Sequence, residues 1–378
     1  MRIALYHDLG PGGAYNFLIE TVSRSRHDYT WFRVNRAADS DGDSDECLLK
    51  EVVGTSDYPL RSGTREIPHL MQLERRVAGD IDAQHFDLAL VHGCRLFQAP
   101  GVLRRVQTPA LYFMQEPRRA SFERGYHGPA FGHPWHPRRA RRFLTDYVLG
   151  VRDKASVAAA DAVVVNSIFS AEAVQAVYGR SASVCLPGVD PDVYTHETSR
   201  RERFVLSVGG LEHAKGHWRV VDALGAVERR NRPDLHVVYG RGSPGAAAQL
   251  AQMADDLGVR LHLHSSIPRR ELVDLYQRAA ATVCAAAGEP FGLTTLESIS
   301  CGTPVVALRR GGYREVIDEG VTGLLVEPQR GALAAGIEAA VLDGIGPIDR
   351  ETRDRVVARF SWDECAGRLD HLCDEAAG

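Results

Sequence analysis

The sequence lacks any long apolar run, has little lysine and carries its cysteines singly. No apolar stretch approaches the roughly 20 residues that a membrane-spanning helix needs, and the chain opens on a strand-like pattern instead of a signal peptide. None of the seven cysteines has the Cys-x-x-Cys spacing of a metal or redox site. The net charge of −4 does not favour nucleic acid as a partner. We therefore expect a cytoplasmic protein without a dedicated metal site or cofactor, and its 378 residues suggest two domains.

The most informative stretch begins with an apolar strand pattern over 281–287, whose end delivers Glu289 to a loop. A short helix is expected over 294–300 and carries Glu297, and a second strand pattern follows at 305–308. The N–H groups at the start of such a helix favour an anionic phosphate, whereas two carboxylates suit neutral sugar hydroxyls. A nucleotide sugar carries both kinds of group, so the pattern predicts a nucleotide-sugar site. The alternative is a solvated acidic loop on an ordinary α/β domain.

This stretch also resembles a known family. Glu289 and Glu297, separated by seven residues and followed by Cys-Gly-Thr-Pro-Val-Val, are similar to the donor-site signature of the family 4 retaining glycosyltransferases. The resemblance covers nearly the whole chain and is strongest over 162–362. It implies the GT-B fold, in which two doubly wound, Rossmann-like α/β domains face a central cleft and a C-terminal helix crosses back to the first domain. The alternation of strand and helix patterns independently favours parallel sheets.

The resemblance also implies domain limits and roles. An acceptor-binding domain is expected over 1–195, completed by a helix over 358–378, and a donor-binding domain over 200–357. By resemblance, Glu297 holds the ribose and Glu289 holds sugar hydroxyls. The residues expected to bind the donor are Gly13, Gly209, Gly210, Lys215, Gly240, Arg241, Ile267, Glu289, Phe291, Gly292, Leu293, Thr294 and Glu297.

One departure from the family concerns the donor diphosphate. Relatives usually clamp it with an arginine and a lysine, and this chain keeps Lys215 but has Gly210 at the arginine position. Lysine occurs only three times in the sequence, which favours a specific role for Lys215 over a solvated helix cap. His213 or Arg241 could replace the lost charge.

A second departure concerns the acceptor. Two apolar strand patterns end at His92 and at Gln115, and ligands gather at such carboxyl ends. The family often has histidine at both places, so the acceptor hydroxyl is expected near Gly13, His92 and Gln115. We count Glu289, Lys215, His92 and Gln115 as the catalytic candidates. If His92 acts as a base, it should titrate near pH ~6.5; otherwise it is a structural histidine at a strand end.

Two charged stretches remain. The acidic residues between 35 and 46 do not follow the ladder of a calcium loop, and we interpret them as a surface loop. The stretch 118–142 is rich in arginine. It suits a solvated basic face, and the alternative is a dock for an anionic or lipid-linked acceptor or a weak peripheral contact with a membrane surface.

The sequence thus predicts a retaining glycosyltransferase of hexosyltransferase type. It would move a sugar from a nucleoside diphosphate sugar to a hydroxyl of a glycoconjugate, polysaccharide or natural-product precursor. Two alternatives stay open, which are a GT-B nucleotide-sugar epimerase and a non-catalytic nucleotide-sugar-binding protein. The departures at Gly210 and Gln115 are the reason for the second.

Overall fold

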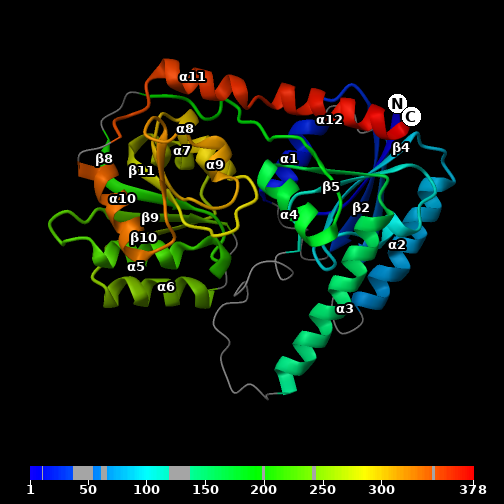
Figure 1. The fold of residues 1–378 in the computed structure, drawn as a ribbon, viewed down its shortest axis with the longest axis horizontal. Coiled ribbons are helices and arrows are strands. Elements are labelled where there is room, and N and C mark those ends of the chain that lie inside the picture. The colour runs from blue at the N-terminus through cyan, green and yellow to red at the C-terminus, as the bar shows by residue number, and fades with distance from the viewer. Residues whose placement is uncertain are drawn as a thin grey trace. The chain divides into compact units, whose positions relative to one another are not determined.

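The computed structural model of the chain describes residues 1–10, 12–36, 54–60, 66–118, 137–197, 201–240, 244–342 and 345–378. It divides into two compact units (Figure 1). The first unit comprises Met1–Pro187 together with Trp362–Gly378, and the second comprises Gly188–Ser361. Residues 188–195, which we expected at the end of the first domain, group with the second unit. Val189 forms a β-bridge with Ser361, and the Tyr194 hydroxyl donates a hydrogen bond to Glu297. Both partners belong to the second unit, which explains the grouping.

The first unit is built around a parallel sheet with the strand order β3-β2-β1-β4-β5-β6-β7. Its strands are β1 (Arg2–Asp8), β2 (Asp28–Arg36), β3 (Gly54–Leu60), β4 (Leu88–Cys94), β5 (Ala110–Met114), β6 (Ala162–Val165) and β7 (Ser183–Val184). Its helices are α1 (Gly13–Val22), α2 (Glu66–Asp82), the 3-10 helix η3 (Gly101–Arg104), α3 (Pro137–Ala159), α4 (Ile168–Tyr178) and α12 (Trp362–Ala377). Strands β4 and β5 are buried along their whole length, as expected for a parallel sheet covered on both faces.

The second unit has a parallel sheet with the strand order β10-β9-β8-β11-β12-β13. Its strands are β8 (Glu202–Val208), β9 (Asp234–Tyr239), β10 (Leu261–Ser265), β11 (Ala279–Cys284), β12 (Val305–Leu308) and β13 (Gly323–Val326). Its helices are the 3-10 helix η5 (His213–Lys215), α5 (His217–Ala226), α6 (Pro244–Asp256), α7 (Arg269–Arg278), α8 (Leu293–Ser300), α9 (Tyr313–Val316), α10 (Arg330–Leu342) and α11 (Arg350–Arg359). Helix α8 confirms the short helix expected between the two strand patterns of the central stretch.

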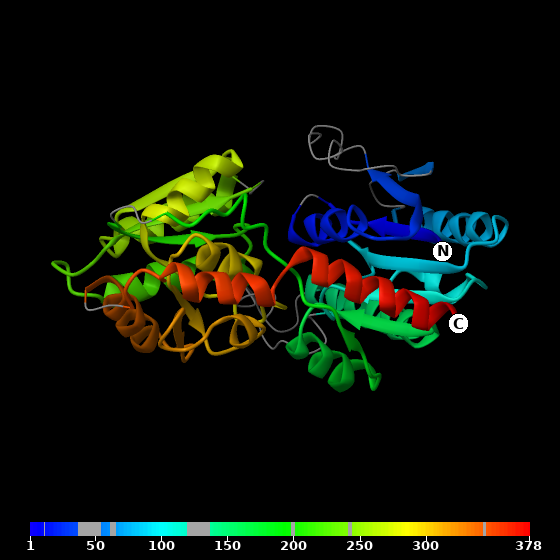
Figure 2. The same cartoon turned by 90° about the horizontal axis from the view of Figure 1, so that it is seen from above.

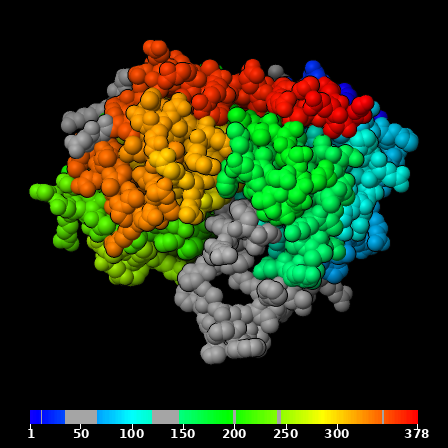
Figure 3. Space-filling model, viewed as in Figure 1, coloured from blue at the N-terminus to red at the C-terminus, as the bar shows by residue number. Residues whose placement is uncertain are grey.

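The two doubly wound α/β units confirm the predicted fold class, including the return of the C-terminal helix. Helix α12 packs against α1 and across β4 and β5, as two views of the chain show (Figures 1 and 2). Phe17 of α1 contacts Trp362 at the start of α12, with ring centroids 5.9 Å apart. The opposite side of α12 forms part of the molecular surface (Figure 3). Among the described residues, no helix is long and apolar enough to cross a membrane.

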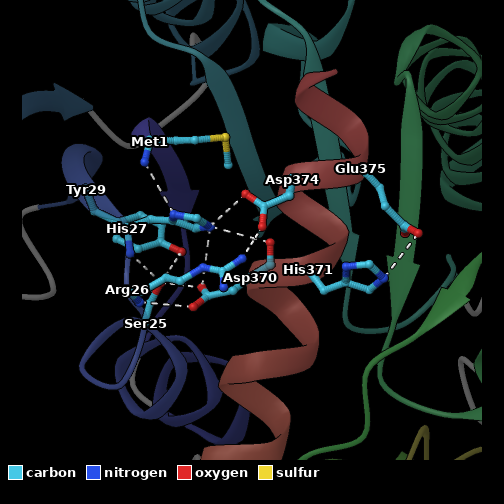
Figure 4. Close-up of polar contacts among 9 residues, drawn as sticks. All are labelled: Met1, Ser25, Arg26, His27, Tyr29, Asp370, His371, Asp374 and Glu375. Carbon is cyan, nitrogen blue, oxygen red and sulfur yellow. Dashed lines mark hydrogen bonds and ion pairs between the residues drawn. The ribbon is translucent and has the colours of Figure 1, made fainter.

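A polar cluster fixes α12 to the segment between α1 and β2 (Figure 4). Asp370 is buried, and its carboxylate accepts hydrogen bonds from the Ser25 hydroxyl and from the Arg26 backbone N–H, the latter at 3.0 Å. Asp374 pairs with the Arg26 guanidinium and lies 3.5 Å from Nε2 of the buried His27. These side chains point from α12 toward the N-terminal segment, so they hold the last helix in the first unit.

The substitution Asp370→Ala should destabilise the protein by about 2–3 kcal/mol, because it leaves the Arg26 N–H and the Ser25 hydroxyl without their charged acceptor. Equilibrium urea denaturation measures the effect. The matched control is Glu375→Ala on the same helix, which removes the exposed His371–Glu375 pair and should cost less than about 1 kcal/mol. Equal effects of the two substitutions would show that the buried cluster does not hold α12.

Candidate functional site

The loop from Ala285 to Gly292 connects β11 to α8 and is enclosed by glycine backbones. A Cβ on Gly216 would lie 2.1 Å from the Ala285 carbonyl oxygen, and one on Gly311 would lie 2.4 Å from that of Glu289. Gly312 is equally close to the Pro290 oxygen, and its N–H donates to the Glu289 carbonyl at 2.9 Å. These contacts are backbone against backbone, so a side chain at any of the three glycines would displace the loop.

The loop brings two of the predicted catalytic residues together. Nζ of Lys215 lies 2.9 Å from Oε2 of Glu289, although the residues are 74 positions apart. Lys215 ends η5, where Gly216 turns the chain with φ of +78° into α5. Both side chains are partly buried, Lys215 with 35% and Glu289 with 17% of its surface exposed. The ion pair is therefore open to solvent on one side and accessible to a ligand.

Glu297 lies in the second turn of α8, and two tyrosines hold its carboxylate. The Tyr194 hydroxyl donates to Oε1 at 2.8 Å and the Tyr276 hydroxyl donates to Oε2 at 2.9 Å. Burial raises the pKa of Glu297, and the two hydrogen bonds oppose that shift. Each carboxylate oxygen keeps a further lone pair, so the group can accept additional hydrogen bonds in a fixed orientation.

The turn after β8 is ordered by a buried histidine. Nε2 of His217 donates to the carbonyl oxygens of Gly209 and Gly210, at 3.2 and 3.1 Å, and Nδ1 lies 2.9 Å from the Ser207 hydroxyl. Burial lowers the pKa of His217, so the ring is neutral near pH 7. Gly209 has φ of +150°. The hydrogen bonds from His217 to the two carbonyl oxygens therefore fix the backbone of the turn at Gly209 and Gly210. His217 was not among the site residues expected from the sequence.

Two basic residues, His213 and Arg219, follow the position of the missing arginine in the chain. A Cβ on Gly210 would lie 2.0 Å from Oε2 of Glu212, which is the end of a flexible side chain. The ring of His213 stacks on Trp218, and burial together with the charge of Arg219 lowers the pKa of His213. His213 is therefore neutral near pH 7 and does not replace the lost charge. Arg219 is permanently charged, and its guanidinium donates to the Ala285 carbonyl at 3.2 Å.

The other residues expected to bind the donor occupy the carboxyl ends of neighbouring strands. Gly240 follows β9 and Ile267 follows β10, while Leu293 and Thr294 open α8 after Gly292, whose φ is +100°. Because the strands are parallel, these ends share one edge of the sheet. Phe291 is buried and contacts Phe360 edge-on, so it packs the loop. Arg241 lies outside the described residues.

In the first unit, His92 and Gln115 lie at the carboxyl ends of β4 and β5. His92 is fully buried and stacks on Phe113, and within the described residues neither ring nitrogen has a hydrogen-bond partner. Burial and the neighbouring His7 lower the pKa of His92 to about 3, well below the value near 6.5 that we expected for a base. Oε1 of Gln115 accepts from Asn166 at 3.3 Å. Gly13 begins α1 directly after Gly12, whose φ is +149°.

The described residues contain no group of three or more histidine, cysteine, aspartate or glutamate side chains arranged to hold a metal ion.

A comparison with protein families identifies a family that matches the part of the chain containing this site. Residues 195–359 match the family described as glycosyl transferases group 1, and the match includes the Lys215–Glu289 pair and Glu297. This part of the chain therefore carries the pattern of that glycosyltransferase family. The recognition based on Glu289, Glu297 and the segment after them is thereby confirmed.

Curated relatives of this chain include two that are named D-inositol 3-phosphate glycosyltransferase. The protein of Xylanimonas cellulosilytica is 33% identical over 237 residues, which are 56% of each chain. That of Corynebacterium efficiens is 35% identical over 220 residues, or 51% of each. The chain thus spans about half the length of these relatives.

Solved structures confirm the GT-B fold of the chain. Sucrose-phosphate synthase from Thermosynechococcus elongatus superposes with a TM-score of 0.75 at 18% identity, covering 99% of this chain and 98% of that one. HepE of Anabaena, solved in complex with UDP-glucose, has a TM-score of 0.72 at 20% identity and covers 99% and 100%. At such identities the likeness establishes the fold alone.

The buried, neutral His92 should make the protein sensitive to acid. Since the pKa of His92 in the folded protein lies far below its ordinary value, the unfolded state binds the proton more tightly. Stability is therefore lost as the pH falls below about 6.5. His92→Phe should reduce that loss by up to about 3 kcal/mol at pH 4 and should change little at pH 8. Urea denaturation at the two pH values measures this, and a parallel pH dependence in variant and wild type would contradict it.

Proposed function

We propose that this chain is a retaining glycosyltransferase that transfers a hexosyl unit from a nucleoside diphosphate sugar to an acceptor hydroxyl. The observation that carries the proposal is the Lys215–Glu289 pair, which stands at the strand edge that also bears the start of α8 and Glu297. The cation and the helix N-terminus suit the diphosphate of a donor molecule, and the two carboxylates suit the hydroxyls of its ribose and its sugar.

The donor assignments follow the chemistry of each group. Lys215 would bind a donor phosphate, and the N–H groups of α8 would add to it because Gly292 gives that helix no side-chain cap. Glu289 would accept from sugar hydroxyls, and Glu297, oriented by its two tyrosines, would accept from the ribose. The UDP-glucose and UDP complexes of HepE support a nucleotide-sugar donor.

The proposed reaction needs no protein base. The bond between the anomeric carbon and the diphosphate oxygen breaks, and the acceptor oxygen forms its bond to that carbon on the same face. The acceptor proton passes to an oxygen of the departing phosphate. His92 fits this route poorly as a base because its pKa is about 3, and the amide of Gln115 cannot take a proton near neutral pH. Gly13 and Gln115 would contact the acceptor, whereas the fully buried His92 fits the alternative of a structural histidine at a strand end. Lys215 would stabilise the charge on the leaving diphosphate.

Lys215→Ala should lower kcat/KM for the donor by at least ~100-fold, the scale of losing one electrostatic stabiliser. The matched control is Lys154→Ala, an exposed lysine of α3, which should leave it unchanged. Adding Gly210→Arg to Lys215→Ala should restore part of the rate, provided that the Glu212 side chain moves aside. Steady-state kinetics with UDP-glucose and related donors provide the measurement. Donor binding without turnover by the wild type would instead identify a nucleotide-sugar-binding protein.

Glu297→Gln should weaken donor binding by about 1.5–3 kcal/mol, since a charged acceptor for the ribose is lost. Glutamine is preferred to alanine because its amide can still pair with the hydroxyls of Tyr194 and Tyr276. Tyr194→Phe should weaken binding less, since the carboxylate keeps one of its two orienting bonds. Titration calorimetry with UDP and UDP-glucose tests both variants. Unchanged affinity in Glu297→Gln would make the carboxylate a purely structural group.

A further inference from the structure

The 3-10 helix η5 carries Lys215 but has no buried residue of its own. It consists of three residues only. Two backbone hydrogen bonds close its turn, from the Lys215 N–H to the Glu212 carbonyl at 3.0 Å and from the Gly216 N–H to the His213 carbonyl at 3.2 Å. The hydrogen-bond geometry of a 3-10 turn is poorer than that of an α-helix, and a single turn fixes more torsions than its bonds repay. The place of the Lys215 ammonium therefore depends on support from neighbouring elements.

Trp218, in the first turn of α5, provides such support through its indole ring. The indole Nε1–H donates to the carbonyl oxygen of His213 at 3.1 Å, so the first residue of η5 is bonded to α5. The His213 ring stacks on the same indole, with ring centroids 4.7 Å apart and an angle of 21° between the planes. One side chain thus holds both the backbone and the side chain of the residue that lies two positions before Lys215.

The indole also connects η5 to the loop that carries Glu289. The guanidinium of Arg219 lies over the Trp218 ring, 4.5 Å from its centroid, and donates to the Ala285 carbonyl at 3.2 Å. Tryptophan is the aromatic side chain that attracts such a cation most strongly. Ala285 begins the loop whose Glu289 pairs with Lys215. Through Arg219 the indole is therefore linked to the segments on both sides of the ion pair.

Trp218 is itself anchored in the second unit. Its partly buried ring packs against the hydrophobic core that includes Val220, Val221 and Leu224 of the same helix. A tryptophan side chain has only two torsions, so little conformational entropy is lost when the ring is fixed. A ring that is fixed by the core in this way can serve as a rigid support for a turn that lies at the surface.

We propose that Trp218 is a positioning residue, which holds η5 so that the Lys215 ammonium stands opposite Glu289. Its effect on the reaction passes through Lys215, whose Nζ it keeps 2.9 Å from the carboxylate. The inference rests on the proposed function, in which Lys215 binds the donor diphosphate. Displacement of a stabilising charge by about 1 Å is sufficient to slow a reaction markedly.

Hydrogen exchange followed by mass spectrometry tests the positioning without any substrate. In Trp218→Leu the backbone amides of Lys215 and Gly216 should exchange at least ~10-fold faster than in the wild type, because their turn opens more often without the indole. Trp218→Phe keeps a ring for the stack and loses only the Nε1–H, so its exchange rates should fall between the two. Equal exchange of these amides in Trp218→Leu and the wild type would overturn the proposal.

The matched control is His236→Leu, which removes another stacked ring of the second unit. The His236 ring lies 4.2 Å from the ring of Phe204, and among the described contacts it is not connected to η5. This variant should leave the exchange of the Lys215 and Gly216 amides unchanged. Circular dichroism verifies that every variant is folded. Faster exchange at η5 in His236→Leu as well would show a general loosening of the unit and would also overturn the proposal.

Steady-state kinetics with UDP-glucose and related donors measure the consequence for Lys215. Trp218→Leu should lower kcat/KM for the donor ~10-fold, and Trp218→Phe should recover most of that loss. Adding Trp218→Leu to Lys215→Ala should cause no further loss, since the group through which the indole acts is already absent. Losses that add in the double variant, or a folded Trp218→Leu with the kcat/KM of the wild type, would contradict the proposal.

The kinetics also separate a failure of this inference from a failure of the proposed function. A large loss in Lys215→Ala together with no loss in Trp218→Leu would overturn only the positioning role of the indole. An unchanged kcat/KM in Lys215→Ala would instead refute the phosphate-binding role of Lys215. The exchange rates of η5 would then decide alone whether Trp218 holds this turn.

Discussion

The close approach of backbone to backbone around the Ala285–Gly292 loop is the constraint on which the site depends. Gly216 in one segment and Gly311 with Gly312 in another allow two parts of the second unit to press against that loop where any side chain would collide. The loop has therefore little freedom to move, and the carboxylate of Glu289 is held opposite Lys215 before any ligand arrives. Preorganisation of this kind reduces the ordering cost of binding, which is how a small number of polar groups can recognise a ligand well.

The two units contribute different chemistry. The second unit gathers charges whose positions are fixed by neighbours, such as Lys215 by Glu289 and Glu297 by two tyrosines. The first unit presents neutral groups at its strand ends, since burial keeps His92 uncharged and Gln115 is an amide. In the proposed reaction charge develops on the leaving group, which suits the fixed charges of the second unit.

Much of this architecture could be predicted from the sequence because its signals are local. Continuous apolar runs such as 110–114 mark buried parallel strands, and the spacing of Glu289 and Glu297 marks the helix start between them. The tyrosines that hold Glu297 could not be predicted, because they reach it from 103 and 21 residues away and only the folded chain shows where their hydroxyls end. The neutrality of His92 was missed for a related reason, since it depends on burial and not on neighbours in sequence.

The place of α12 in the chain has a consequence for biosynthesis. The whole of the second unit, residues 188–361, is translated between the first unit and the helix that completes it. At bacterial elongation rates this takes on the order of ten to thirty seconds. During that interval the surface that receives α12, which includes Phe17 and the backbone of Arg26, has no native cover. The first unit therefore leaves the ribosome with the Phe17 ring and the Arg26 N–H without the partners that the last helix later supplies.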